Sequence, residues 1–230
     1  VYQCLAGEQR DKVRRLIITA AGGPFRTWSR ERIAAATAKD ALKHPNWDMG
    51  AKITIDSATM MNKAFEIIEA RWLFDMEPER ISAIVHPQSI IHSMVEFTDG
   101  AIKAQLGVPD MRLPIAYALG CADRLEGAER PLTTDQLATL TFEQPDTSRF
   151  PCLALADEAI RRGGNAACVI NAANEIAVAA YLHGQIGFYD IYDTIAHTLG
   201  NASYIAEPGY ADYVASNTEA RTIAREYIKR

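Results

Sequence analysis

The clearest hydrophobic pattern in the chain is a short apolar run followed directly by an amphipathic segment. Residues 52–55 alternate as a buried strand does, and a helix is predicted from about residue 59 to Phe74. Its core-facing stripe has helical spacing: Met61, Phe65, Ile68 and Trp72. The opposite edge is polar: Asn62, Glu66 and Glu69, with Thr59 and Lys63 beside them. Polar side chains are therefore expected near a helix start, where anions bind well.

Short strands and helices alternate through the first half of the chain. The apolar runs at 15–20 and 81–85 predict strands, and Asp99-Gly100 between 93–98 and 101–106 predicts a hairpin. Three short helices are also expected: one after Ser29, one after Thr37, and one over 111–119.

The second half has a different character. Residues 121–148 are rich in turn residues, and four helical segments follow: 151–162, 165–182, 188–199 and 217–229. We expect an α+β fold, in which a mixed sheet with flanking helices precedes a small C-terminal helical bundle. The expected domains are a catalytic and dimerisation domain at 1–120, a linker at 121–148 and a helical domain at 149–230.

Composition narrows the function class. The net charge is −5 and dense Lys/Arg runs are lacking, which argues against a dedicated nucleic-acid surface. The four cysteines are widely spaced and form no CxxC pair, as in a reduced cytoplasmic protein. No apolar run is long enough to span a membrane. We therefore expect a cytoplasmic protein with a small-molecule ligand.

The polar edge of the 59–74 helix is the first candidate site. A phosphate group could take the Ser57 hydroxyl, backbone N–H groups and Lys63, which would leave Glu66 for a cation or a proton. A second anion contact could come from Gly22-Gly23, which follow a strand. The alternative for this helix is purely structural: Ser57 as a helix cap, with Lys63 and Glu66 as a surface pair.

Other segments are compatible with function or with packing alone. His44 and Trp47, with Met49, lie in an irregular segment that could close over a ligand, or Trp47 could be a core anchor. His86 and His92 are six residues apart, which argues against shared zinc ligation. Residues 107–112 form a Pro-Asp-Met turn that could present an apolar edge to a flat ring. Asn171, Asn174 and Glu175 are expected to hold the helical bundle together.

Six blocks in order give the chain a strong resemblance to the 1-deoxy-D-xylulose 5-phosphate reductoisomerase family. The blocks are GGPFR (22–26), HPNW (44–47), MGAKITIDSATMMNKAFEIIEARWLF (49–74), HPQSIIHSM (86–94), GVPDMR (107–112) and NAANEIAVAA (171–180). The resemblance implies a homodimeric enzyme that uses NADPH and Mg²⁺ or Mn²⁺ to isomerise and reduce 1-deoxy-D-xylulose 5-phosphate. The product would be 2-C-methyl-D-erythritol 4-phosphate, in non-mevalonate isoprenoid (terpenoid) biosynthesis.

The resemblance also implies roles for individual residues. His44, Lys63 and Glu66 match catalytic positions, and Glu66 matches a metal ligand. The matched substrate-binding positions are Ala21, His44, Trp47, Met49, Ser57, Asn62, Lys63, Glu66, Ser89 and His92. Those near the cofactor are Gly50, Pro109 and Met111.

Two departures from the family pattern affect the expected function. Ala21 stands where the family has a phosphate-binding serine, and whether a neighbouring hydroxyl such as that of Thr19 compensates is left open. The family's dinucleotide domain and its Asp-Ser-Glu metal motif would precede Val1, so we expect this piece alone to be inactive. The alternative is a non-catalytic phosphosugar-binding or dimerisation module derived from such an enzyme.

Overall fold

The computed structural model describes residues 1–45, 49–121, 123–125 and 131–229. The predicted lid residue Trp47 lies outside these ranges. The chain divides into two compact units, each built from two separate segments. The sheet unit comprises residues 1–21 and 79–145, and the helical unit comprises residues 22–78 and 146–230. The domain boundaries expected from the sequence stay a prediction, because this division describes packing rather than independent folding.

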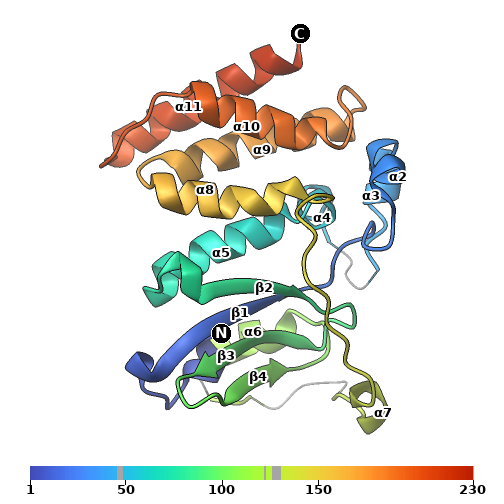
Figure 1. Ribbon diagram of the computed structural model, residues 1–230, viewed down its shortest axis with the longest axis vertical. Coiled ribbons are helices and arrows are strands. Elements are labelled where there is room, and N and C mark those ends of the chain that lie inside the picture. Colours follow the sequence, from blue (N-terminus) through green and yellow to red (C-terminus); the bar gives the residue numbers. More distant parts are fainter. Residues whose placement is uncertain (46–48, 122, 126–130, 230) are drawn as a thin grey trace. The chain divides into compact units, whose positions relative to one another are not determined.

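The sheet unit is built on a four-stranded mixed sheet in the order β2-β1-β3-β4 (Figure 1). The strands are β1 (Val13–Ala20), β2 (Ile81–Val85), β3 (Ile91–Phe97) and β4 (Ile102–Leu106). β1 pairs with β2 in parallel and with β3 antiparallel, and β3 pairs antiparallel with β4. The predicted hairpin is confirmed: Gly100 has a φ of +88°, and the Ala101 N–H donates to Asp99 Oδ1 at 2.9 Å.

Short helices and turns complete the sheet unit. They are α1 (Tyr2–Leu5), a 3₁₀ turn (Arg10–Lys12), α6 (Arg112–Leu119) and α7 (Thr134–Leu137), and another 3₁₀ turn (Pro78–Arg80) leads into β2. The core includes Leu16 and Val95, neither of which is exposed. Part of the predicted linker is bound to the sheet, because Val85 and Glu143 form an antiparallel bridge.

The helical unit combines helices from both halves of the chain. From the first half come α2 (Arg30–Ala34), α3 (Ala38–Ala41), α4 (Ala51–Ala58) and α5 (Met61–Phe74). From the second half come a 3₁₀ turn (Pro151–Ala154), α8 (Leu155–Arg162), α9 (Ala166–Leu182), α10 (Asp190–Asn201) and α11 (Tyr210–Ile228). The largely buried α9 contacts α4, α8, α10 and α11 (Figure 1). The predicted fold class, a mixed sheet with flanking helices followed by C-terminal helices, is confirmed.

The strand predicted at 52–55 is wrong, since these residues belong to helix α4. In a strand, Ile53 and Ile55 would lie on the same face and be buried alike. Here Ile55 is fully buried, whereas Ile53 is 42% exposed. Local contacts at helical spacing stabilise the turn instead. Lys52 Nζ donates to Asp56 Oδ2 at 2.7 Å, and Thr54 Oγ1 donates to the Gly50 carbonyl at 2.9 Å.

The predicted stripe on α5 is correct at its beginning and wrong at its end. Met61 is fully buried and Ile68 is 8% exposed, but Trp72 is 73% exposed. The buried side of α5 instead includes Ala64, Ile67 and Ala70. Since Trp72 lies in the last turn of the helix, the packed stripe ends about one turn before the helix does.

Candidate active site

His44 and Ser57 form the centre of the polar site in the helical unit. His44 Nε2 lies 3.1 Å from Ser57 Oγ. Partial burial lowers the pKa of His44, because desolvation disfavours the charged imidazolium. A neutral imidazole beside a hydroxyl can accept its proton or donate to it, depending on which ring nitrogen is protonated.

The Gly22-Gly23 loop packs closely against the backbone of Ser57. Gly22 and Gly23 have φ values of +87° and +65°, a backbone conformation that glycine adopts readily. A Cβ atom at Gly23 would lie only 2.7 Å from the Ser57 carbonyl oxygen. Both the loop conformation and its close approach therefore require glycine at position 23.

The sequence pattern placed Ser57 at the start of a helix, but the structure does not. It occupies the last turn of α4, and α5 begins only at Met61 after Met60, whose φ is +61°. The Met61 N–H donates to Thr59 Oγ1 at 3.3 Å. The helix-start argument for an anion at Ser57 is therefore wrong, and an anion there would be bound by side chains, among them the Ser57 hydroxyl and the His44 imidazole.

Asn62, Lys63 and Glu66 form one hydrogen-bonded cluster on α5. Asn62 Nδ2 donates to Glu66 Oε1 at 2.9 Å, and Lys63 Nζ is paired with Glu66 Oε2. The Lys63 side chain is 10% exposed, and that of Glu66 is 35% exposed. Glu66 is therefore already paired rather than open, although its exposure leaves it accessible to a ligand.

The start of helix α4 holds the remaining predicted residues of this unit. Gly50 is the N-cap of α4 and is exposed, and a Cβ there would meet no atom of the described residues within 4 Å. Met49, the described residue of the predicted lid, is half-buried. As far as the described residues are concerned, Gly50 thus leaves open space beside the start of the helix.

In the sheet unit, His92 is tied to the loop that leads into α6. Its Nε2 lies 3.1 Å from the Gly107 carbonyl oxygen, so this nitrogen carries the proton. Burial lowers the pKa of His92, which keeps the ring neutral. The ring also lines a cavity of about 620 Å³ together with Tyr117 and Cys121.

An ion pair between Arg112 and Asp110 stabilises the loop that carries Pro109 and Met111. Arg112 Nη2 and Nε donate to Asp110 Oδ2 at 2.6 and 2.9 Å, and this pairing lowers the pKa of Asp110. Pro109 is half-buried and Met111 is 57% exposed. The turn therefore presents an apolar side chain to solvent, and its contact with a flat ring stays a prediction.

Ser89 and Ala21 complete the predicted set. Ser89 has a φ of +52°, and its N–H donates to the His86 carbonyl at 3.0 Å in a tight turn. Ala21 follows β1 and is half-buried. The question left open for Thr19 is answered: its hydroxyl donates to the Ile91 carbonyl at 2.6 Å, so its one proton is already used.

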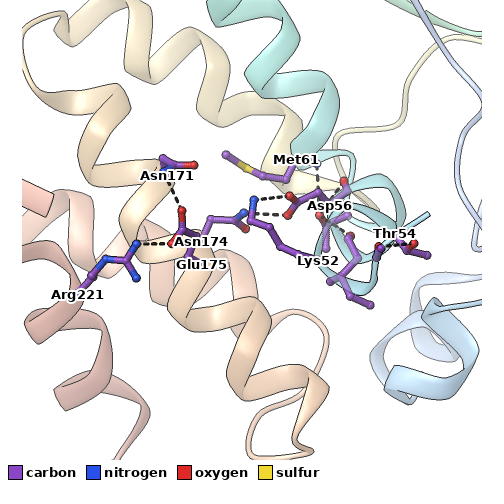
Figure 2. A network of polar contacts seen from close by, with 11 residues as sticks. Lys52, Thr54, Asp56, Met61, Asn171, Asn174, Glu175 and Arg221 are labelled. Atoms are coloured by element: carbon purple, nitrogen blue, oxygen red, sulfur yellow. Dashed lines mark hydrogen bonds and ion pairs between the residues drawn. The ribbon is translucent and has the colours of Figure 1, made fainter. Parts of the chain in front are cut away.

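A second polar network was only partly anticipated (Figure 2). Asn174 Nδ2 donates to Asp56 Oδ1 at 2.8 Å, which joins α9 to α4. Glu175 accepts from Asn171 at 3.2 Å and is also paired with Arg221 of α11. The prediction that these residues hold the helices together is confirmed for Asn174 and Glu175, whereas Asn171 contacts Glu175 within α9 itself. The part played by Asp56 was missed, although the Lys52–Asp56 spacing of four residues was a signal for it.

The described residues do not form a complete metal site on their own. Nowhere among them do three His, Cys, Asp or Glu side chains gather closely enough to hold an ion. Glu66 can contribute one hard oxygen ligand, whereas Mg²⁺ requires octahedral coordination. The remaining ligands would have to come from elsewhere.

Among the helices of the described residues, none combines the length and the hydrophobicity that a membrane span requires.

Comparison with protein families settles the relationship that these residues suggest. Residues 106–223 match the family described as DXP reductoisomerase C-terminal domain, and residues 1–74 match 1-deoxy-D-xylulose 5-phosphate reductoisomerase C-terminal domain. The chain belongs to the 1-deoxy-D-xylulose 5-phosphate reductoisomerase family.

Individual relatives agree with this assignment. The reductoisomerase of Bacteroides fragilis is 58% identical over 228 residues, which cover 99% of this chain and 59% of the relative. That of Chlorobium chlorochromatii is 51% identical over 99% of this chain and 60% of its own length. The chain thus spans about three fifths of the length of these curated reductoisomerases.

Solved reductoisomerase structures share the fold. The enzyme from Zymomonas mobilis in complex with NADPH superposes with a TM-score of 0.91 at 48% identity, covering 99% of this chain and 59% of that one. A reductoisomerase in complex with NADPH, fosmidomycin and magnesium gives a TM-score of 0.89 at 39% identity, with coverages of 99% and 60%.

The predicted site residues of this family member divide between the two units. Those of the helical unit are His44, Met49, Gly50, Ser57, Asn62, Lys63 and Glu66, and those of the sheet unit are Ala21, Ser89, His92, Pro109 and Met111. Within the helical unit, His44 contacts Ser57, and Asn62 and Lys63 both contact Glu66.

Proposed function

We propose that the protein carrying this chain converts 1-deoxy-D-xylulose 5-phosphate into 2-C-methyl-D-erythritol 4-phosphate, with NADPH and a divalent metal. The observation that carries the proposal is the His44–Ser57 pair next to the Gly22-Gly23 loop, in a chain of the reductoisomerase family. Solved relatives with NADPH, magnesium and the inhibitor fosmidomycin support the same cofactors here.

The substrate phosphate is proposed to bind in the helical unit. Ser57 donates its hydroxyl proton to a phosphate oxygen, and His44 donates from its ring N–H or, once protonated, adds a positive charge. Lys63 supplies a cation whose side chain is largely buried, so its attraction for an anion is less screened than at an exposed site. Asn62 adds an amide donor to the same edge of α5.

Glu66 is the residue of this chain proposed to hold the metal. A bound Mg²⁺ or Mn²⁺ would supply Lewis acidity toward the substrate's carbonyl and hydroxyl oxygens. Further ligands are expected from those oxygens and from the family's Asp-Ser-Glu motif. If a metal took Glu66 Oε2, that oxygen would give up its contact with Lys63, and the Lys63 ammonium would be available to the substrate.

The remaining residues are proposed to hold the cofactor and close the site. Met111 and Pro109 give the nicotinamide an apolar surface, and Gly50 leaves room for the cofactor. Trp47 and Met49 would cover the bound substrate and exclude water, as in other lid-closing enzymes. Ser89 and His92 are proposed to contact the substrate.

The protein is further proposed to act as a homodimer in the cytoplasm, on a small phosphosugar and without a nucleic-acid or membrane partner. Family resemblance supports the dimer, and the negative net charge argues against a nucleic-acid role.

The test is oxidation of NADPH by the protein encoded by the whole gene, followed by its absorbance, with deoxyxylulose phosphate and with or without Mg²⁺. Metal-dependent oxidation is expected. Glu66→Gln should lower kcat by at least about a hundredfold. Glu69→Gln is the matched control, because Glu69 is exposed on the same helix.

Unchanged turnover in Glu66→Gln would remove Glu66 from the metal site. Folded protein that binds NADPH but never oxidises it would instead favour a non-catalytic phosphosugar-binding module. The replacement of the family serine by Ala21 is the observation that keeps this second function in view.

A further inference from the structure

Asp56 precedes Ser57 in α4. Considered within α4 alone, a carboxylate at position 56 would destabilise the helix. Asp56 lies near the C-terminal end of α4, where the helix dipole disfavours a carboxylate, and its side chain is only 4% exposed. A buried charge needs close partners. Among the described residues, Lys52 Nζ donates to one Asp56 oxygen at 2.7 Å and Asn174 Nδ2 donates to the other at 2.8 Å.

Asn174 is equally unusual on its own helix. It is fully buried in α9, and its Oδ1 accepts no hydrogen bond from the described residues. Burying an amide with one half unsatisfied is unfavourable, so packing inside α9 would be better served by an apolar residue. The hydrogen bond to Asp56 is the interaction that makes an amide useful at this position.

The same stretch of α9 also holds the last helix. Glu175 is paired with Arg221 of α11, and the neighbouring Asn174 faces Asp56 of α4 (Figure 2). Two adjacent residues of α9 therefore fasten α11 and α4 to it.

We propose that Asp56 and Asn174 are positioning residues that fix α4 against α9 and thereby hold Ser57 and its partner His44 in place to receive a phosphate group. Ser57 is the next residue of the same helical turn, so a rotation or slide of α4 that this bond prevents would also displace the Ser57 hydroxyl. The proposal rests on the function proposed above, since it assigns the phosphate to Ser57.

The test exchanges donor and acceptor while keeping side-chain volume. Asn174→Asp brings two carboxylates face to face and breaks the bond, whereas Asp56→Asn combined with Asn174→Asp restores it in the reverse direction. Asn171→Asp is the matched control, because it makes the same substitution on α9 beside Glu175 without touching Asp56.

The probe is inorganic phosphate, titrated calorimetrically into the whole-gene protein at pH 8. We expect Asn174→Asp to raise the Kd of phosphate about tenfold, the effect of losing one hydrogen bond to a charged group. The exchanged pair and Asn171→Asp should both stay within about twofold of the unmodified protein. In turnover, KM for the phosphorylated substrate should rise in Asn174→Asp while kcat and KM for NADPH hold.

A merely structural bond would lower the unfolding temperature of Asn174→Asp and leave phosphate affinity unchanged, and that result overturns the proposal. So does an exchanged pair that folds but binds phosphate as weakly as Asn174→Asp. If Asn174→Asp or the exchanged pair does not fold, Asn174→Leu decides, because it removes the bond without burying a second carboxylate: a Kd raised about tenfold supports the proposal, and unchanged affinity overturns it. Protein that binds phosphate but oxidises no NADPH contradicts the proposed function only.

Discussion

At the scale of single residues, His44 combines a shifted pKa with a specific partner. Burial lowers its pKa, so the unfolded chain binds the proton more readily than the folded one. The stability that neutral His44 contributes is therefore complete above its ordinary pKa of about 6.5 and is lost as the pH falls through the folded value. A phosphate anion acts in the opposite direction, because a nearby negative charge favours the imidazolium.

We therefore predict that His44 titrates below about pH 6.5 in phosphate-free buffer, and that adding phosphate raises its pKa. The measurement is the pH dependence of its imidazole resonances by NMR. Sodium chloride at equal ionic strength is the control, since screening alone provides no bound anion. A pKa at or above the ordinary value without phosphate would contradict the burial argument.

Ala21 allows a substitution that should improve binding. Because the Thr19 hydroxyl is already donated to the Ile91 carbonyl, it does not replace the serine that the family has at position 21. Ala21→Ser should lower KM for the phosphorylated substrate about two- to tenfold with kcat unchanged, the effect of one added hydrogen bond. Ala20→Ser is the control, because it adds the same hydroxyl one residue earlier, at the last position of β1. An unchanged KM in Ala21→Ser would mean that the phosphate lies elsewhere.

At the scale of elements, a helix and a strand at residues 52–55 predict different effects of substitutions on stability. In a strand, residues 53 and 55 point to the same face, whereas here Ile55 is fully buried and Ile53 is 42% exposed. Ile55→Ala should therefore lower the free energy of unfolding by about 2–4 kcal/mol, and Ile53→Ala by less than about 1 kcal/mol. Urea denaturation of both variants measures the difference. Equal losses would argue for the strand.

The same helix shows where sequence patterns were sufficient and where they were not. The hairpin at Asp99-Gly100 was predictable because its turn chemistry is local. Residues 52–55 were not, because the consecutive β-branched residues at 53–55 resemble a strand, whereas α4 also packs against residues far away in the chain. Asp56 shows this most clearly, since its partner Asn174 is 118 residues away in the chain.

The candidate site was predictable to a similar extent. Asn62, Lys63 and Glu66 contact one another because helical spacing alone brings them together. The contact of His44 with Ser57 crosses between a loop and a helix, and helical spacing did not indicate it. Family resemblance named both residues, but only the fold supplies their 3.1 Å contact.

At the scale of the whole molecule, the edge strand and the last helical turn of α6 leave apolar side chains of the sheet unit exposed. β4 is the last strand of the sheet, and four of its five residues are exposed. Its Ile102 is 55% exposed, and Leu119 at the end of α6 is 79% exposed. An exposed edge strand with apolar side chains promotes unwanted pairing unless something covers it. A second copy of the chain, as in the proposed homodimer, is the covering partner we expect.

Analytical ultracentrifugation of the whole-gene protein should therefore show a dimer that dissociates when Ile102 is replaced by Glu. A charge at that position would have to be desolvated on association, which opposes dimer formation. Tyr210→Glu is the control, because Tyr210 is 86% exposed at the start of α11 in the helical unit and should leave the dimer intact. If Tyr210→Glu dissociates the dimer and Ile102→Glu does not, the interface belongs to the helical unit, and the exposed edge of β4 needs another explanation.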